Sequence, residues 1–346
     1  MQFSLVVQTS FLGDLVLTTP LLAELAQRGP VHVVATPSGA PLLARNADIA
    51  GLTVYDKRGA ARGVGGLANV AGAISAARTR AAAEGASDAV AYLAQGSVRS
   101  AALARLAGFR TRVGFTTSAG RWLYTRRVPY RDDRHHAERL WSLAASDPQA
   151  SPTTEQLRPK LFPGGTEREA VDRLLAEHGV RGEPLVALAP GSVWATKRWP
   201  YYPELAQLLR DTRLVIIGAK DDAPLASEIL RVAGDRAIDA TGRLSLLGSA
   251  ELIARCAALV TNDSAPQHLA SAVGTATITV FGPTVVDFGF GPLAPHSTTA
   301  GVSGIDCRPC DRHGPMQCPL GHWRCMRDLT PEVVAAAVAR LRGERP

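Results

Sequence analysis

The chain has 346 residues, of which 46% are hydrophobic and 20% are charged, as in an ordinary soluble globular protein. This length exceeds what one hydrophobic core normally serves, so it favours two domains. No stretch approaches the roughly 20 apolar residues of a membrane span. Residues 1–14 lack the basic segment of a secretion signal, and five cysteines do not suggest a disulfide scaffold, so we expect a cytoplasmic protein.

The net charge of +7 is uneven along the sequence. Before residue 165 there are 19 Lys and Arg against 11 Asp and Glu, and after it 19 against 20. Nine arginines fall within 105–139: Arg105, Arg110, Arg112, Arg121, Arg126, Arg127, Arg131, Arg134 and Arg139. Such a surface would attract anions, whether a phosphorylated glycolipid, an anionic membrane or nucleic acid. The alternative is a solvated arginine-rich face that binds nothing.

The first half alternates short apolar, β-branched runs with helical stretches. Strands are predicted at 3–9, 31–35, 52–55 and 88–94, and helices from about Asp14 and near 68–84. This alternation is typical of parallel βαβ units.

A second alternating series follows residues 146–169, a stretch rich in Pro, Ser, Thr and Gly that suits a linker. Its strands are predicted at 184–190, 213–219, 237–241, 258–261 and 275–281, with helices at 226–234 and 246–256. A last helix follows Thr330 and Pro331, a cap residue and a proline at the first helical position. We therefore predict an α/β protein with two doubly wound sheets: domains at 1–160 and 161–330, then a terminal helix at 331–346.

Polar residues follow the predicted strand at 258–261: Asn262, Asp263, Ser264 and His268. In open α/β sheets, the loops beyond the carboxyl ends of the strands line the ligand crevice. Asp263 and Ser264 stand where the next helix starts, so they could simply cap it. The same free N–H groups, at the positive end of the helix dipole, also make an anion site. His268 is either part of that site or a partly buried structural histidine.

The segment 190–200 also follows a predicted strand. It contains Ser192, which permits close backbone approach next to a glycine, and Lys197 with Arg198, whose cationic donors suit a diphosphate. Its tryptophans could pack in the core or stack on a ligand. The chain has neither a Walker loop nor a GxGxxG motif after a strand, which disfavours the common nucleotide triphosphate and nicotinamide sites.

Near the N-terminus, the first strand is predicted to end in a turn at Gly13, with Asp14 opening a helix. Asp14 could merely complement the helix dipole. Facing a crevice between two domains, it could instead act as a general base.

These segments resemble the successive motifs of the bacterial lipopolysaccharide heptosyltransferases, glycosyltransferase family 9, and most of all the heptosyltransferase II type. The resemblance is carried by TSFLGDLVLTTP (9–20), AYLAQGSVRSAAL (91–103), HHAERLWSLA (135–144), APGSVWATKRWP (189–200), TNDSAPQHLASAV (261–273) and VFGPT (280–284). It implies a GT-B fold, in which two Rossmann-like domains face a central cleft. The first domain would bind the acceptor, the second ADP-heptose, and the last helix would cross back to the first domain.

The resemblance also implies roles for individual residues. Asp14 is the candidate catalytic base, and Lys197 the candidate contact to the donor diphosphate. The other candidates for the donor site are Ser192, Asp222, Asp263, Ser264, Ala265 and His268; those for the acceptor site are Gly13, Arg99, Arg126 and Arg127. Where many relatives carry Gly this chain has Ala265, and where some have a ribose-binding Glu it has the shorter Asp222.

The implied reaction is inverting transfer of a heptose from ADP-L-glycero-D-manno-heptose to the inner core of lipopolysaccharide. A base on one face of the anomeric carbon and cationic stabilisation of the leaving ADP on the other suffice, so we expect no cofactor and no catalytic metal. The expected partners are the ADP-sugar, an anionic glycolipid built on lipid A and, transiently, the inner leaflet of the inner membrane. No nucleic acid is expected.

Alternatives remain open for the activity. A transferase of the same family could use another nucleotide sugar or an acceptor other than lipopolysaccharide. A nucleotide-sugar hydrolase or epimerase would share the donor cleft but would not need a basic acceptor domain. A glycolipid-binding protein without catalytic activity is the third alternative.

Four cysteines near the C-terminus are spaced C-x2-C-x7-C-x6-C: Cys307, Cys310, Cys318 and Cys325. Such a set can bind zinc or an iron–sulfur cluster, but the last two spacings match no standard zinc module, so free or packed thiols are the other interpretation. Similar tails occur in some heptosyltransferases that add the second heptose.

Overall fold

A computed structural model describes residues 1–147 and 150–343. The chain forms two compact units, Met1–Phe162 and Pro163–Pro346, each treated by itself below. Residues 148–149 of the predicted linker and 344–346 of the predicted terminal segment lie outside the described residues. No helix among the described residues is both long enough and apolar enough to cross a membrane.

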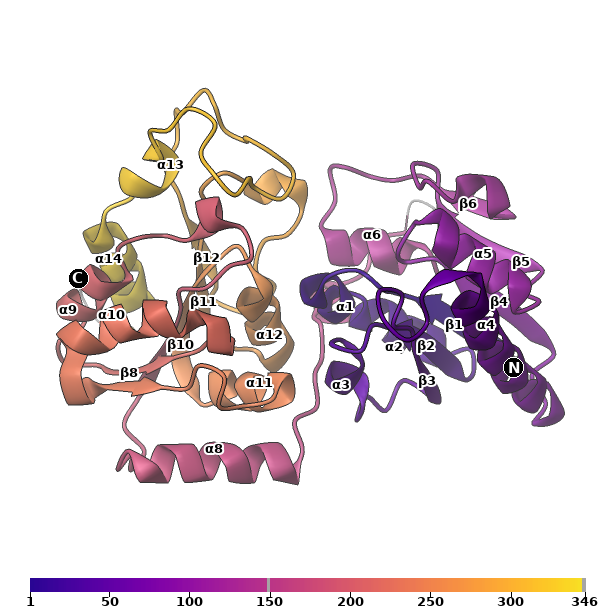
Figure 1. The fold of residues 1–346 in the computed structure, drawn as a ribbon, viewed down its shortest axis with the longest axis horizontal. Coiled ribbons are helices and arrows are strands. Elements are labelled where there is room, and N and C mark those ends of the chain that lie inside the picture. The colour runs from indigo at the N-terminus through magenta and orange to yellow at the C-terminus, as the bar shows by residue number, and fades with distance from the viewer. Residues whose placement is uncertain (148–149, 344–346) are drawn as a thin grey trace. The chain divides into compact units, whose positions relative to one another are not determined.

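The first unit is built on a six-stranded parallel sheet (Figure 1). Its strands are β1 (Gln2–Val7), β2 (Val31–Ala35), β3 (Gly51–Val54), β4 (Asp88–Tyr92), β5 (Thr111–Phe115) and β6 (Arg126–Val128). The strand order β3-β2-β1-β4-β5-β6 is that of a Rossmann fold, and it reverses between β1 and β4.

Helices connect these strands and cover the sheet. They are α1 (Leu12–Leu17), α2 (Thr19–Ala26), α3 (Ala40–Leu43), α4 (Gly63–Ala83), α5 (Val98–Leu106), α6 (His136–Ser142) and α7 (Thr154–Leu157). Helices α1 and α2 pack against α6, and α4 packs against α5. Every residue of β2 is buried, as expected for a parallel strand covered on both faces.

The second unit repeats this arrangement with a second six-stranded parallel sheet. Its strands are β7 (Leu185–Ala189), β8 (Arg213–Ile216), β9 (Ala237–Asp239), β10 (Cys256–Asn262), β11 (Thr277–Val280) and β12 (Thr298–Ala300). The order β12-β11-β10-β7-β8-β9 is the same Rossmann order, now reversing between β7 and β10. The predicted class of two doubly wound α/β sheets is confirmed.

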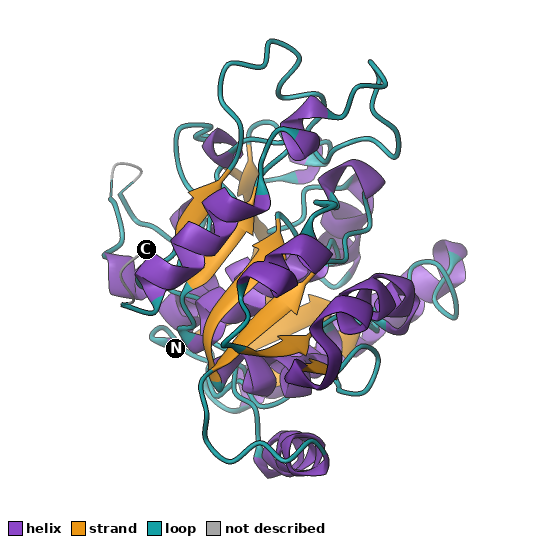
Figure 2. Ribbon diagram, turned by 90° about the vertical axis from the view of Figure 1, so that its left-hand side faces the viewer, coloured by secondary structure: helices purple, strands orange, loops and turns teal. Residues whose placement is uncertain are grey.

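Figure 2 shows strands sandwiched between helices. The helices of the second unit are α8 (Gly165–Glu177), α9 (Tyr202–Leu208), α10 (Ala223–Ala233), α11 (Leu246–Ala254), α12 (Ala265–Val273), α13 (Arg324–Arg327) and α14 (Pro331–Leu341). Helices α10 and α14 pack against α9, whereas α8 and α12 pack against α11.

The last helix, α14, begins at Pro331 as predicted. Its buried residues Val334, Ala337 and Val338 belong to the hydrophobic core of the second unit, and the helix packs on α9. Its apolar face is therefore buried within the second unit.

Three features differ from the sequence-based predictions. The stretch predicted as a linker contains α7, which starts with a Thr153–Gln156 capping box, and the beginning of α8. Strands β5, β6 and β12 were not predicted, because they are short and two of them carry arginines in place of apolar residues. Gly13 lies inside α1 rather than in a turn, because the helix already begins at Leu12.

Candidate active site

In the second unit, polar residues gather at the carboxyl ends of β7 and β10, where the strand order reverses. Asn262, the last residue of β10, is fully buried and ties the loop after β7 to the sheet. Its Nδ2 donates to the carbonyl of Pro190 at 2.8 Å, and its Oδ1 accepts from the N–H of Trp199 at 3.2 Å and from the Tyr202 hydroxyl at 3.3 Å. Asn262 thus fixes the loop that carries Lys197.

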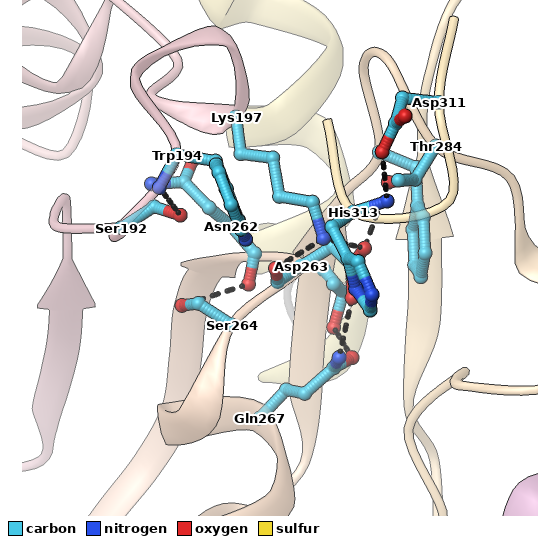
Figure 3. Close-up of polar contacts among 12 residues, drawn as sticks. Ser192, Trp194, Lys197, Asn262, Asp263, Ser264, Gln267, Thr284, Asp311 and His313 are labelled. Carbon is cyan, nitrogen blue, oxygen red and sulfur yellow. Dashed lines mark hydrogen bonds and ion pairs between the residues drawn. The ribbon is translucent and has the colours of Figure 1, made fainter. Parts of the chain in front are cut away.

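Lys197 and Asp263 form an ion pair at this edge (Figure 3). Lys197 Nζ lies 2.6 Å from Asp263 Oδ2, and each side chain is only 10% exposed. The carboxylate also accepts from Thr284 Oγ1 at 2.7 Å and, on Oδ1, from Gln267 Nε2 at 3.0 Å. Asp263 is therefore already bonded within the protein through both oxygens, and it holds the ammonium of Lys197 in place.

The ammonium of Lys197 keeps part of its donor capacity. An ammonium has three N–H donors. One meets Asp263 Oδ2, and a second lies 3.3 Å from the main-chain oxygen of Asp263. Among the described residues the third has no partner, so it remains available to an anionic ligand.

The N-terminus of α12 adds a second source of positive potential. Ser264 is its N-cap residue but its side chain makes no capping hydrogen bond, which excludes capping as the role of this side chain. Its Oγ lies instead 3.4 Å from the carbonyl of Asn262 and 3.5 Å from that of Gly191. Ala265 is the first helical residue, and His268, one turn on, is buried with its Nε2 3.4 Å from Gln267 Nε2. An uncapped helix N-terminus suits a phosphate.

Asp222 lies at the same edge of the second sheet, just beyond β8. Its Oδ2 accepts from the N–H of Ala219 at 2.9 Å. The backbone of Gly191 comes so close that a β-carbon there would stand 2.4 Å from Asp222 Oδ1 and would displace the Asp222 carboxylate. Ser192, the next residue, accepts a hydrogen bond from the N–H of Trp194 at 3.3 Å. The structure thus places the predicted Ser192 and Asp222 near the Lys197 loop.

Nothing in the sequence indicated that residues beyond β12 also contact the loop that carries Lys197. The carbonyl of Pro315 accepts from the N–H of Thr196 at 3.4 Å and from its hydroxyl. The ring of His313 stacks on Trp194, with centroids 6.1 Å apart and planes at 15°. The loop predicted only as a cysteine-rich tail therefore covers the segment that precedes Lys197.

The cysteines of this loop are free thiols. Cys307 Sγ lies 3.7 Å from His322 Nε2. Burial and the neighbouring thiols raise the pKa of Cys310, and raise the pKa of Cys325 to about 11. In residues 1–147 and 150–343, no three His, Cys, Asp or Glu side chains are arranged to hold a metal ion.

In the first unit, Asp14 lies in the first turn of α1, after the strand β1 at which the sheet order reverses. Ser10 Oγ lies 2.5 Å from Asp14 Oδ2, and His136 Nε2 lies 3.6 Å from Asp14 Oδ1. Asp14 is 20% exposed and His136 13% exposed. The carboxylate is thus held on one oxygen and still reachable from solvent.

Two cationic residues, Arg99 and Lys57, lie beyond the carboxyl ends of strands in the first sheet. Arg99 is an exposed residue in the first turn of α5, the helix that follows β4. Lys57 donates from Nζ to the carbonyl of Thr9 at 2.5 Å. Partial burial, together with the charges of Arg58 and Arg99, lowers the pKa of Lys57.

The arginines within 105–139 differ in burial and in their partners. Arg139 is buried and donates to the Tyr130 hydroxyl at 2.8 Å, so the predicted basic surface is smaller than the sequence suggested. Arg126 and Arg127 lie on β6, and Arg126 donates to the carbonyl of Leu143 at 2.7 Å. Arg127 faces the ring of Trp122, which is 75% exposed.

Comparisons with known proteins find relatives by sequence and by fold. The sequence profile of glycosyltransferase family 9 (heptosyltransferase) matches residues 81–323. The lipooligosaccharide heptosyltransferase 2 of Haemophilus influenzae is 29% identical over 180 residues, which cover 48% of this chain and 50% of that protein. The chain thus spans about half the length of the curated relatives that it matches first.

Solved structures match over the whole chain. A glycosyltransferase family 9 protein from Veillonella parvula has a TM-score of 0.82 at 22% identity, covering 99% of this chain and 98% of that one. The ADP-heptose lipopolysaccharide heptosyltransferase II of Escherichia coli has a TM-score of 0.76 at 23% identity, with coverage of 99% and 98%. At these identities the likeness establishes the fold, which is GT-B.

Proposed function

Because the chain belongs to glycosyltransferase family 9, we propose that it is an inverting heptosyltransferase, which moves a heptose from ADP-L-glycero-D-manno-heptose to the inner core of lipopolysaccharide. The name of the Escherichia coli relative supports ADP-heptose as the donor. The name of the Haemophilus influenzae relative supports a lipooligosaccharide acceptor.

The observation that carries this proposal is the Lys197 ammonium, held beside an uncapped helix N-terminus where the second sheet reverses its order. A diphosphate needs hydrogen-bond donors and positive charge, and both are fixed in position before the ligand arrives. We assign the ADP moiety to this site, with Lys197 and the α12 N-terminus at its phosphates. Ser192, Asp222, Ala265 and His268 complete the proposed donor site.

On the acceptor side, we propose that Asp14 is the general base. It follows the strand at which the first sheet reverses, and it is partly exposed. Among the described residues no lysine or arginine pairs with it, so its carboxylate is not neutralised by a fixed cation. Gly13, Arg99, Arg126 and Arg127 are the proposed acceptor contacts, and the three arginines suit a phosphorylated or carboxylated sugar.

The proposed reaction is one displacement. Asp14 takes the proton from an acceptor hydroxyl, whose oxygen attacks the anomeric carbon as the bond to ADP breaks. The leaving electrons go to the ADP phosphate oxygen, where Lys197 and the helix dipole stabilise the charge. A single displacement inverts the anomeric centre, and no step requires a metal or a cofactor. A transient contact with the inner leaflet of the membrane would bring the enzyme to its lipid-linked acceptor.

The test is a transfer assay read by mass spectrometry, with ADP-heptose and other nucleotide sugars as donors and inner-core glycolipids as acceptors. We expect transfer from ADP-heptose to be insensitive to a chelator. Lys197→Ala should weaken ADP binding about tenfold to hundredfold, because a hydrogen bond to a charged group contributes about 1.5–3 kcal/mol. Rapid release of ADP without any acceptor would instead favour a hydrolase. Activity abolished by a chelator but retained in Lys197→Ala would contradict the metal-independent mechanism.

A further inference from the structure

We infer that His136 is a positioning residue for Asp14, which holds the second oxygen of this carboxylate while leaving it able to take a proton. The inference rests on the proposed role of Asp14 as the general base. It concerns a side chain that comes from a different helix, more than one hundred residues further along the chain.

The two oxygens of Asp14 have different neighbours. Ser10 Oγ is 2.5 Å from Oδ2, within the range of a strong hydrogen bond to a carboxylate. His136 Nε2 is 3.6 Å from Oδ1, which is too long for a full hydrogen bond. We assign the N–H of the ring to Nε2, where it attracts Oδ1 from a distance that leaves the lone pairs of this oxygen free, so Oδ1 is the oxygen that we expect to take the proton.

The sequence HHAER places this ring by local capping. His135 is the N-cap residue of α6 and accepts the N–H of Ala137 on its Nδ1 at 3.1 Å. Helix α6 consequently begins at His136. Since α6 packs against both α1 and α2, its first residue is held at the side of α1 where Asp14 lies. The two adjacent histidines thus have separate tasks, one in capping the helix and one in facing the carboxylate.

The charged groups in and before α6, and the lysine that bonds just beyond β1, have other partners. Arg134 pairs with Glu138 within the region around α6. Arg139 bonds to the Tyr130 hydroxyl and to main-chain carbonyls. Lys57 donates to the carbonyl of Thr9. In the part of the chain that the structure describes, His136 is therefore the basic side chain that pairs with Asp14.

This arrangement matters because a general base works only when the accepting oxygen points at the hydroxyl. With Ser10 on one oxygen and His136 beside the other, rotation of the Asp14 side chain is restricted before the acceptor binds. Misplacement of a reacting group by about 1 Å can cost roughly 100-fold in rate. His136 gains or loses no bond in the reaction, since the proton passes from the hydroxyl to Oδ1.

The test compares His136→Phe with His136→Gln in the transfer assay. Phe keeps the bulk but has no N–H, so we expect kcat to fall about tenfold to hundredfold, with an unchanged KM for ADP-heptose. Gln keeps an N–H at the end of its side chain and should recover part of the loss. His135→Asn, which retains a capping side chain, is the matched control and should keep normal kcat. If His136→Phe does not fold, His136→Asn, whose amide is too short to reach, replaces it.

A double-mutant experiment separates this inference from the proposed function. In an Asp14→Asn background, His136→Phe should cause no further loss, because the residue acts through Asp14. An equal further loss would show that His136 acts independently and would overturn the inference. If His136→Phe has normal kcat while Asp14→Asn is inactive, the inference is wrong and the base assignment stands. Near-normal turnover in Asp14→Asn would remove the base assignment itself.

Discussion

The two units share one topology, yet the aspartates that follow their first and fourth strands are used in opposite ways. Asp263 in the second unit has a lysine ammonium at 2.6 Å and two further donors, from Gln267 and Thr284. Asp14 in the first unit has one hydroxyl and an imidazole at 3.6 Å. In each unit the carboxylate follows one of the two strands between which the strand order reverses, and the neighbouring side chains decide its chemistry.

The difference follows from the side chains that contact each carboxylate. A carboxylate whose two oxygens are occupied by an ammonium and neutral donors suits the task of holding a cation. A carboxylate without a fixed cation, and with part of its surface exposed, can meet a substrate hydroxyl. The contrast therefore separates a structural aspartate from a candidate base without reference to relatives.

The largest expected effect comes from Asp14→Asn. This change keeps the size of the side chain and can keep the bond from Ser10, so we expect folding and ADP binding to be unchanged. Because a general base contributes about 10²–10⁴-fold, kcat should fall by that factor. Initial rates by mass spectrometry and ADP calorimetry measure both quantities. A variant that turned over at the normal rate would show that the two aspartates do not differ as described.

The same substitution in the second unit should act first on stability. Asp263→Asn leaves the Lys197 ammonium buried without a counter-charge, and breaking a buried pair in this way costs about 3–5 kcal/mol in the free energy of unfolding. Denaturant unfolding measures this loss. The double variant Asp263→Asn with Lys197→Met removes both charges and should recover much of it. If Asp263→Asn were as stable as the parent, the pair would not hold the loop.

The sequence predicts part of this contrast between the two aspartates. The alternation of apolar runs predicts both sheets, and the end of β10 predicts that Asn262 and Asp263 lie at a ligand edge. The pattern cannot show that Gln267 and Thr284 saturate Asp263, because that depends on how α12 and the turn after β11 pack. For the same reason, Asp263 and Lys197 were both predicted as donor contacts rather than as partners of each other.

On the acceptor side too, the sequence pattern cannot predict which residues pack together. Arginines in one segment look alike in sequence, but Arg139 is buried against Tyr130, whereas Arg127 lies by an exposed tryptophan. Strands β5 and β6 were missed because Thr, Arg and Gly interrupt the apolar pattern. His136 was noted only within a motif, since nothing local indicates that α6 packs on α1.

The smallest expected effect concerns the exposed arginines, and it sharpens the contrast between a basic acceptor surface and an enclosed donor site. Raising the salt concentration should weaken acceptor binding more than ADP binding, because exposed charges are screened beyond roughly 8 Å at physiological ionic strength. Arg127→Ala should lower the apparent acceptor affinity about two- to fivefold and reduce its salt dependence, as a single exposed charge does. Arg126→Ala should act in the same direction, because both arginines are exposed and both donate to main-chain carbonyls, Arg126 to Leu143 and Arg127 to Arg121. The measurement is the acceptor KM at several salt concentrations. If donor and acceptor binding were equally sensitive to salt and Arg127→Ala had no effect, the arginines would be a solvated face without a ligand.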